Sequence, residues 1–264
     1  MEEIDKPEGP TSDPLARLLE EAVELARKAG ELTLGYFGST GLAVEHKSDG
    51  SPVTRADRHA ERLIREELAR RHPGDGILGE EEVDKPSETG RRWIIDPIDG
   101  TLAFTHGVAL YANLLALEDE DGIAIGVINL PVIGETVYAG RGLGCYCNGV
   151  KAHVSERDDL ARSYLTTSTF ANWSNLALLG ARRAGTELHT WGDGYGYALV
   201  ATGRVDAMVD MQAATWDLAP MSVIISEAGG RLTDLRGEPR YDGGSGLASN
   251  GRIHDALLSI LAVS

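Results

Sequence analysis

Trp93-Ile-Ile-Asp-Pro-Ile-Asp-Gly-Thr101 places two carboxylates, Asp96 and Asp99, directly after a run of large apolar residues. The apolar run is typical of a buried strand, and we expect the strand to break at Pro97. The Gly-Thr pair would then open a helix, where free backbone N–H groups bind anions well. The stretch therefore offers oxygen ligands for a hard cation beside a cradle for a phosphate. Both aspartates could also be ordinary turn and capping residues.

Two further acidic segments adjoin apolar runs. Gly79-Glu80-Glu81 follows the short run Ile77-Leu78, and Trp216-Asp217 precedes a strongly apolar helical pattern over residues 218–228. Taken alone, Asp217 could be a helix N-cap, and the glutamates could form a solvated acidic loop. The three acidic segments taken together, in this order, form a much more specific combination than any one of them.

This ordered set resembles the inositol monophosphatase superfamily of magnesium-dependent phosphatases, and the resemblance runs from about Leu15 to the C-terminus. It implies an α+β fold, a layered αβαβα sandwich of two mixed or antiparallel sheets with helix layers. The metal site would lie between the two halves of the sandwich. We expect a single catalytic phosphatase domain over residues 14–264, with halves meeting near residue 150, after an acidic disordered tail at residues 1–13.

The resemblance implies a set of metal ligands: Glu80, Asp96, Asp99, Asp217 and the carbonyl oxygen of Ile98. Oxygen-only ligands favour Mg²⁺ or Mn²⁺ over Zn²⁺. Several acids that converge on one cleft would also repel one another strongly unless cations lie among them. Two metals roughly 3.5–4 Å apart can hold the attacking and leaving oxygens of an in-line displacement. Gly100 and Thr101 would bind the phosphate at the start of their helix.

Asp57 has two interpretations. Thr54-Arg55-Ala56-Asp57 resembles a capping box with aspartate in place of the usual Glu or Gln, which is a purely structural role. The family resemblance implies instead that Asp57 hydrogen-bonds Thr101 and that this pair orients the attacking water with help from Glu80. Lys47 matches a basic residue near the family's site, although a solvated lysine fits the same sequence.

Substrate choice is expected in the second half of the chain. Gly192-Asp-Gly-Tyr-Gly-Tyr197 follows a predicted strand and opens a predicted helix, so Asp193 could simply be a helix cap. The string also resembles the histidinol-phosphatase branch of the superfamily, which implies that Asp193 and Asp210 contact the substrate. Two acids suit a cationic leaving alcohol such as histidinol, and they could also bind the hydroxyls of a polyol. Gly194 departs from the cysteine usual in that branch, and Ala214 from the histidine of typical animal inositol monophosphatases.

Composition agrees with a soluble enzyme. The 264 residues carry 41 acidic and 25 basic side chains, a net charge of −16, which argues against nucleic acid as a partner. No apolar run reaches membrane-spanning length, and the acidic N-terminus lacks the apolar stretch of a signal peptide. The chain has only two cysteines, Cys145 and Cys147, so a reducing cytoplasm is the simplest location.

Hydrophobic periodicity predicts alternating helices and strands. Helices are expected over residues 14–36, from 54 to the His72-Pro73-Gly74 stop, 173–184, 195–202, 216–228 and from about 253. Strands are expected over residues 93–95, 110–117, 123–130, 135–139, 164–168, 188–191, 205–211 and 247–249. Asp121-Gly122 is a strong hairpin signal, so the three strands after the aspartate motif should form an antiparallel meander.

The sequence therefore predicts a cytoplasmic, Mg²⁺-dependent phosphomonoester hydrolase, with Mn²⁺ as the other candidate metal. Its partner would be a small phosphorylated metabolite, most simply histidinol phosphate, hydrolysed by a metal-activated water in histidine biosynthesis. Inositol-1-phosphate or another sugar phosphate is the alternative substrate. A non-catalytic binding protein of the same fold would be expected to lack a metal ligand or Thr101, and all of them are present. The family is often dimeric, which makes a homodimer a candidate assembly.

Overall fold

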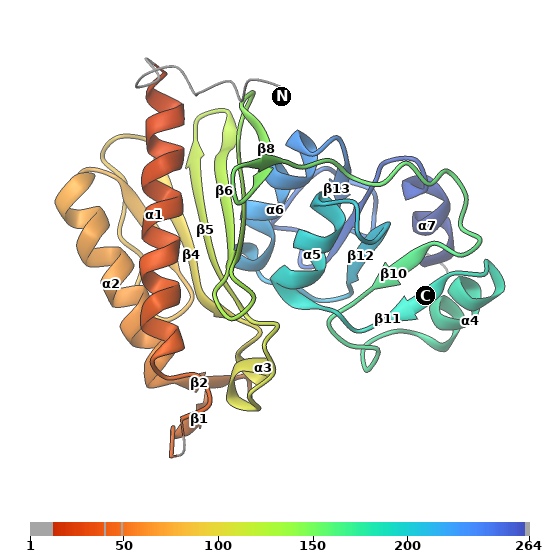
Figure 1. The fold of residues 1–264 in the computed structure, drawn as a ribbon, viewed down its shortest axis with the longest axis horizontal. Coiled ribbons are helices and arrows are strands. Elements are labelled where there is room, and N and C mark those ends of the chain that lie inside the picture. Colours follow the sequence, from red (N-terminus) through yellow and green to blue (C-terminus); the bar gives the residue numbers. More distant parts are fainter. Residues whose placement is uncertain (1–12, 40, 49, 262–264) are drawn as a thin grey trace, which may run out of the picture.

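Two β-sheets and three layers of helices alternate through the part of the chain that the structure describes (Figure 1). The structure is a computed structural model that describes residues 13–39, 41–48 and 50–261. Apart from Asp13, which caps the first helix, the predicted acidic tail lies outside the described residues. The expected αβαβα sandwich is confirmed.

The helices form one outer layer on each side and one layer between the sheets (Figure 1). The first outer layer consists of α1 (Pro14–Leu34) and α2 (Arg55–Arg71). The central layer consists of α5 (Asp193–Ala201) and α6 (Thr215–Glu227). The second outer layer consists of α4 (Asn175–Arg183) and α7 (His254–Leu261). None of the helices in the described residues is long and apolar enough to cross a membrane.

The larger sheet has the strand order β3-β4-β5-β6-β7-β8-β9. Its strands are β3 (Gly76–Gly79), β4 (Arg92–Asp99), β5 (Ala112–Asp119), β6 (Gly122–Leu130), β7 (Glu135–Gly140), β8 (Gly144–Cys147) and β9 (Val150–Lys151). Only β3 and β4 pair in parallel among these strands, and the rest form an antiparallel meander. The predicted hairpin is confirmed, with its turn one residue earlier, at Glu120 and Asp121, and with Gly122 as the first residue of β6.

The smaller sheet has the order β11-β10-β12-β14-β13 and mixes parallel with antiparallel pairs. Its strands are β10 (Tyr164–Thr166), β11 (Glu187–His189), β12 (Ala207–Asp210), β13 (Arg231–Thr233) and β14 (Gly246–Ser249). A separate hairpin of β1 (Val44–His46) and β2 (Pro52–Thr54) precedes α2. Sequence periodicity missed β1, β2, β3, β8, β9 and β13, because strands of two to four residues carry too little pattern.

Helices cover both faces of the larger sheet, which explains why its central strands are apolar without interruption. Alternate residues divide between two cores. Ile95 and Leu115 pack toward α1 and α2, whereas Ile94 and Leu114 pack toward α5 and α6. The central strands are therefore buried on both sides, and their carboxyl ends are held rigidly.

Strand β4 corrects one prediction from the sequence. It does not break at Pro97 but continues to Asp99. Asp96 pairs with Leu114 and Asp99 with Ala112, so β4 contains one residue more than β5 at this point, which is a β-bulge. A bulge leaves a ladder position unpaired, and proline is tolerated there although it lacks the N–H group. A smaller difference is that α1 ends at Leu34, before the predicted Tyr36.

Candidate active site

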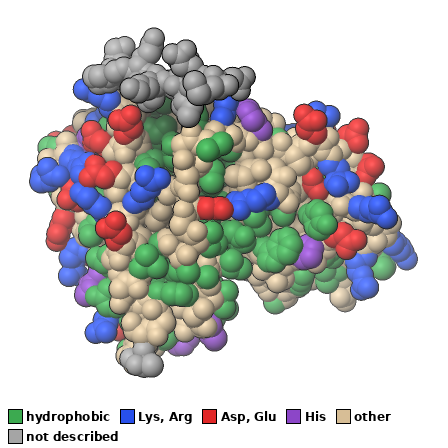
Figure 2. All heavy atoms as spheres, viewed as in Figure 1, with side chains coloured by type: hydrophobic (Ala, Val, Ile, Leu, Met, Phe, Trp, Pro, Cys, Tyr) green, Lys and Arg blue, Asp and Glu red, His purple; other side chains and the backbone are tan. Residues whose placement is uncertain are grey.

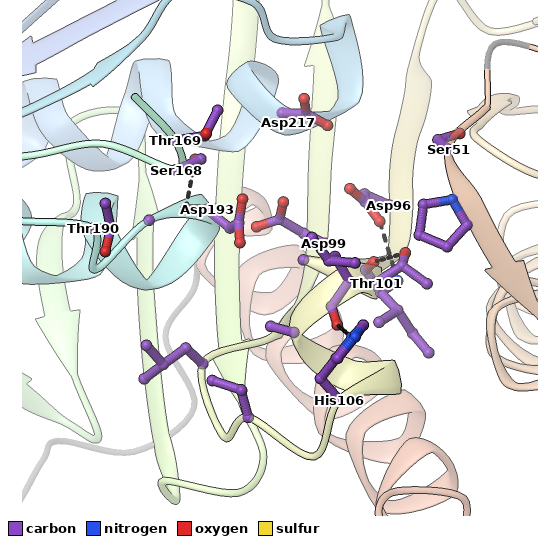
Figure 3. A pocket seen from close by; sticks show the side chains of 18 of the residues that line it. Ser51, Asp96, Asp99, Thr101, His106, Ser168, Thr169, Thr190, Asp193 and Asp217 are labelled. Atoms are coloured by element: carbon purple, nitrogen blue, oxygen red, sulfur yellow. Dashed lines mark hydrogen bonds between the residues drawn. The ribbon is translucent and has the colours of Figure 1, made fainter. Parts of the chain in front are cut away.

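Three carboxylates meet at the bulge of β4. Asp96 and Asp99 belong to the segment from Asp96 to Thr101, which we call the aspartate loop, and Asp217 lies in the first turn of α6. One oxygen from each carboxylate lies within 4.8 Å of the others. Figure 3 shows the three side chains turned toward a common space. The fold thus brings together acids that are more than 100 residues apart in the sequence.

The three carboxylates destabilise one another's charges. Burial raises the pKa of Asp96 well above its usual range, and the charges of Glu80, Asp99 and Asp217 raise it further. Burial and the nearby Asp193 and Asp217 charges act in the same direction on the pKa of Asp99. The pKa of Asp217 rises to about 7, chiefly through burial. A buried cluster of oxygen donors with mutual repulsion fits a hard divalent cation such as Mg²⁺ or Mn²⁺.

Glu80 lies next to this cluster but is held by Lys47. The Nζ atom of Lys47 is 2.6 Å from Oε1 of Glu80 and 2.6 Å from Oε1 of Glu81. Burial lowers the pKa of Lys47, but the hydrogen bonds and charges of the two glutamates outweigh burial and raise it overall. Lys47 is therefore a partner of the site's acids and not a freely solvated side chain. The role of Glu80 as a metal ligand stays a prediction.

Glu81 is enclosed, in contrast to a solvated acidic loop. Its side chain is only 5% exposed, and burial raises its pKa to about 7. The backbone N–H groups of Glu81 and Glu82 donate to the buried carboxylate of Glu61 at 2.8 and 3.1 Å. These bonds attach the loop after β3 to α2.

The two interpretations of Asp57 are both compatible with the structure, because its two oxygens have different partners. Oδ2 accepts hydrogen bonds from the backbone N–H and the hydroxyl of Thr54 at 2.8 and 2.7 Å, which completes the capping box of α2. Oδ1 lies 3.2 Å from the hydroxyl oxygen of Thr101, which is also 2.9 Å from the carbonyl oxygen of Ile98. Burial raises the pKa of Asp57 above its usual value.

Gly100 lies at the start of the short helix α3 (Thr101–Thr105), as the sequence predicts. Its φ of 80° is left-handed, a conformation that favours glycine. A Cβ atom at this position would also lie 2.9 Å from Oδ2 of Asp193. The aspartate loop and the start of α5 are therefore in close contact.

Asp193 is not a helix cap, so this alternative from the sequence is wrong. The N-cap of α5 is Gly192, and no side chain caps the helix. Asp193 has a left-handed φ of 54°, and its N–H group donates to the Ser168 hydroxyl at 2.9 Å. The next N–H group, of Gly194, donates to Oδ2 of Asp99. Left-handed backbone costs energy for aspartate, and here it lets α5 contact the aspartate loop.

Asp217 is not the N-cap of its helix either. The N-cap of α6 is Ala214, and Asp217 accepts a hydrogen bond from its N–H group at 2.7 Å. The carboxylate thus stabilises the helix start from the third position while an oxygen faces the cluster.

Asp210, at the end of β12, is buried and firmly held. One oxygen accepts from the Ser168 hydroxyl at 2.7 Å, and the other accepts from the Tyr197 hydroxyl at 2.9 Å. Burial raises the pKa of Asp210 to about 6. Sequence analysis missed Ser168 and Tyr197 as holders of this acid. Only the position of Ser168 at the end of a predicted strand and the presence of Tyr197 in the Gly-Asp-Gly-Tyr-Gly-Tyr string could have suggested them.

A cavity of about 680 Å³ opens over the aspartate loop. Its walls include residues from both halves of the chain: Glu80, Asp96, Thr101, Ser168, Asp193 and Asp217. Figure 2 shows a notch in the lower edge of the molecule, between the half that carries α3 and the half that carries β10 and β11. A smaller cavity of about 80 Å³ adjoins Asp193 and Asp210. Asp193 lines both cavities, whereas Asp210 lines only the smaller one.

Known proteins of similar sequence and fold define the class of this chain. Its residues 15–263 match the model of the Inositol monophosphatase family. The histidinol-phosphatase of Chlorobaculum parvum is 45% identical over 88% of this chain and 91% of its own length. That of Mycobacterium tuberculosis is 39% identical over 91% of this chain and 96% of its own. The solved Thermotoga maritima IMPase has a TM-score of 0.86 and 31% identity, covering 94% of this chain and 97% of its own.

The chain belongs to the inositol monophosphatase family. Its relatives are named phosphatases, and it is accordingly a phosphoric monoester hydrolase.

Proposed function

We propose that this protein is a Mg²⁺-dependent histidinol-phosphate phosphatase, which converts L-histidinol phosphate and water to L-histidinol and phosphate. The observation that carries the substrate assignment is Asp193, a carboxylate on the cavity wall beside the aspartate loop. The similarity to histidinol-phosphatases at 45% and 39% identity supports the same assignment.

The residues of the aspartate loop have complementary parts in this proposal. Glu80, Asp96, Asp99, Asp217 and the Ile98 carbonyl would hold divalent cations, which supply positive charge to the phosphate oxygens and the departing alkoxide. The N–H groups of Gly100 and Thr101 would donate to the phosphate. The Thr101 hydroxyl has Oδ1 of Asp57 and the Ile98 carbonyl oxygen as acceptors for its proton, so its own oxygen would accept a hydrogen bond from the attacking water. Asp57 and Thr101 thereby orient this water, with help from Glu80.

The leaving group would be recognised by charge. Histidinol carries an ammonium group close to its phosphate ester, and inositol carries none. Asp193 faces the cavity directly and is placed to accept a charge-assisted hydrogen bond from that ammonium. Asp210 lines only the smaller cavity. The Ser168 hydroxyl connects the two residues, because it accepts from the backbone N–H group of Asp193 and donates to the carboxylate of Asp210. Asp210 would therefore add negative charge and rigidity more than direct contact.

A substrate panel tests the proposal. Released phosphate is measured with histidinol phosphate, inositol-1-phosphate and a generic aryl phosphate, with Mg²⁺, with Mn²⁺ and after exhaustive EDTA treatment. We expect the highest kcat/KM on histidinol phosphate and no turnover after chelation. A preference for inositol-1-phosphate would overturn the substrate assignment only, while full activity without metal would overturn the metal site.

The proposed biosynthetic role, homodimer and cytoplasmic location each need a measurement of their own. A role in histidine biosynthesis is checked by complementation of a strain that lacks histidinol-phosphatase. The homodimer is checked by light scattering, and the cytoplasmic location by fractionation.

A further inference from the structure

A row of buried polar side chains crosses the larger sheet beneath α1. Asn113 on β5 pairs directly with Asn129 on β6, and Asn129 pairs with Thr136 on β7. Their exposed fractions are 1%, 4% and 3%. The neighbouring residues on these strands are almost all apolar, so three adjacent polar residues at the centre of a sheet need a reason. We call these three residues the polar row.

Hydrogen bonds run along the polar row in one direction. The side chain of Arg27 on α1 donates to the Thr136 hydroxyl at 3.1 Å, and that hydroxyl donates to Oδ1 of Asn129 at 3.0 Å. Nδ2 of Asn129 donates to Oδ1 of Asn113 at 3.0 Å. Nδ2 of Asn113 then donates to the carbonyl oxygen of Pro97 at 2.6 Å. The row therefore ends on the backbone of the aspartate loop.

The end point coincides with the bulge in β4. Asn113 lies between the ladder partners of Asp96 and Asp99, opposite the extra residue of the bulge. The peptide that links Pro97 to Ile98 is planar and trans, so its C=O and N–H groups point in opposite directions. Asn113 holds the C=O group, and the N–H group of Ile98 donates to Oδ1 of Asp96 at 3.1 Å. One peptide plane thus connects the Asn113 amide to a carboxylate of the metal cluster.

Close packing keeps the polar row in place. Gly30 of α1 passes directly over it, and a Cβ atom there would lie 2.3 Å from Nδ2 of Asn129 and 3.0 Å from Oδ1 of Asn113. Asn129 also donates to the carbonyl oxygen of Ala26 at 3.2 Å. Buried amides with all these partners have a single favourable orientation, because an alternative rotamer would leave a polar group unpaired.

We propose that Asn113 is a positioning residue, which orients the Asp96 carboxylate through the Pro97–Ile98 peptide and so sets the affinity of the site for its divalent cation. The inference rests on the proposed function in one respect, namely that Asp96 is a metal ligand. Partners of metal ligands typically contribute roughly 10- to 100-fold in metal affinity.

Two variants separate positioning from packing. Asn113→Leu keeps the branched shape of the side chain but removes the bond to Pro97. Asn129→Leu is the matched control, because it breaks the polar row and leaves the donor and acceptor of the Asn113–Pro97 bond in place. The first measurement is amide hydrogen exchange at Ile98 in the metal-free protein. We expect exchange to become about 10-fold faster in Asn113→Leu and to stay near the wild-type rate in Asn129→Leu. The second is Mn²⁺ binding by calorimetry, where Asn113→Leu should bind about 10-fold more weakly and the control should not.

Each outcome decides the inference. Equal exchange rates and Mn²⁺ affinities in the two variants, whether both changed or both unchanged, overturn it, because the polar row would then act by packing alone. If Asn113→Leu does not fold, Asn113→Ser replaces it, since serine stays polar but is too short to reach the Pro97 carbonyl. Failure of the wild type to bind Mn²⁺ would overturn the proposed function, and the exchange comparison would still decide whether Asn113 orients the loop.

Discussion

At the scale of single residues, the two carboxylate oxygens of Asp57 have different hydrogen-bond partners. Oδ2 caps α2 through Thr54, and Oδ1 lies 3.2 Å from the Thr101 hydroxyl oxygen. Asparagine can keep an oxygen on the cap while presenting an NH₂ group to Thr101. Asp57→Asn should therefore cost about 1 kcal/mol or less in the free energy of unfolding. Its turnover should fall roughly 10²–10⁴-fold, because Thr101 loses its carboxylate acceptor and keeps only the Ile98 carbonyl.

Substitution of Thr101, alone and together with Asp57, tests whether the two residues act as one unit. If the two residues act as one unit, Thr101→Ala should lose a similar factor in kcat, and the double variant should lose little more. Thr54→Ala removes the hydroxyl bonds to Ala56 and to Oδ2 of Asp57 but keeps the backbone bond to Oδ2 and the contact between Oδ1 and Thr101. It should therefore lower the melting temperature and reduce kcat much less than Asp57→Asn. Additive losses in the double variant would show that Asp57 and Thr101 act separately.

Asp96 should be dispensable for folding and essential for turnover. Asparagine keeps the acceptor for the Ile98 N–H group but removes one of several repelling charges. In EDTA, Asp96→Asn should therefore unfold at the wild-type temperature or higher. With Mg²⁺, its kcat should be lower by at least ~10³-fold, because charge neutralisation and cation positioning are both lost. A variant that unfolds early in EDTA would instead assign Asp96 a structural role.

At the scale of elements, periodicity predicted the long helices and the meander because each buries an apolar face over many residues. The bulge at Pro97 was not predictable, since a proline after a strand usually marks its end. Nor could the sequence show that Asn113 and Asn129 pair across β5 and β6, because register depends on contacts between strands. The metal-ligand candidates were found from the sequence because motif order identified them, whereas their hydrogen-bond partners depend on the folded arrangement.

His254 at the start of α7 connects three elements and makes stability depend on pH. The buried imidazole lies 2.9 Å from the Thr233 hydroxyl oxygen of β13 and 2.8 Å from the Ser249 hydroxyl oxygen of β14. Burial, followed by the charge of Arg231, lowers the pKa of His254 to about 4 from an unfolded value of about 6.5. The unfolded chain therefore binds the proton first, and the stability from neutral His254 is complete above pH ~6.5 and is lost as pH falls toward 4.

The corresponding measurement is chemical denaturation between pH 7 and 4, compared with His254→Gln, which does not titrate. The wild type should lose up to about a factor of ten in its folding equilibrium constant per pH unit, beyond any loss in the variant. Parallel pH profiles for the two proteins would rule out His254 as the source.

At the scale of the whole molecule, the two halves supply different chemistry to one cavity. The aspartate loop begins in β4, and Glu80 directly follows β3 of the same sheet. Asp217 lies in α6, Asp193 in α5 and Asp210 in β12. Figure 3 shows Asp96, Asp99, Asp193 and Asp217 around one space. Direct contact between Asp193 and Gly100 joins the halves at the site. In the proposed function, the aspartate loop would hold the phosphate and Asp193 would read the leaving alcohol, so the two roles can be tested by separate substitutions.

Replacing the two acids of the second half tests this division. Asp193→Asn removes one charge at a left-handed position that asparagine also tolerates, so the backbone should be preserved. A charge-assisted hydrogen bond to an ammonium is worth about 1.5–3 kcal/mol, so kcat/KM for histidinol phosphate should fall roughly 10- to 150-fold. Turnover of an aryl phosphate, which lacks the ammonium, should barely change.

Asp210→Asn should show a smaller selective loss, because Ser168 and Tyr197 already occupy its oxygens. Equal losses on histidinol phosphate, inositol-1-phosphate and the aryl ester would mean that both acids serve the metal site or the fold.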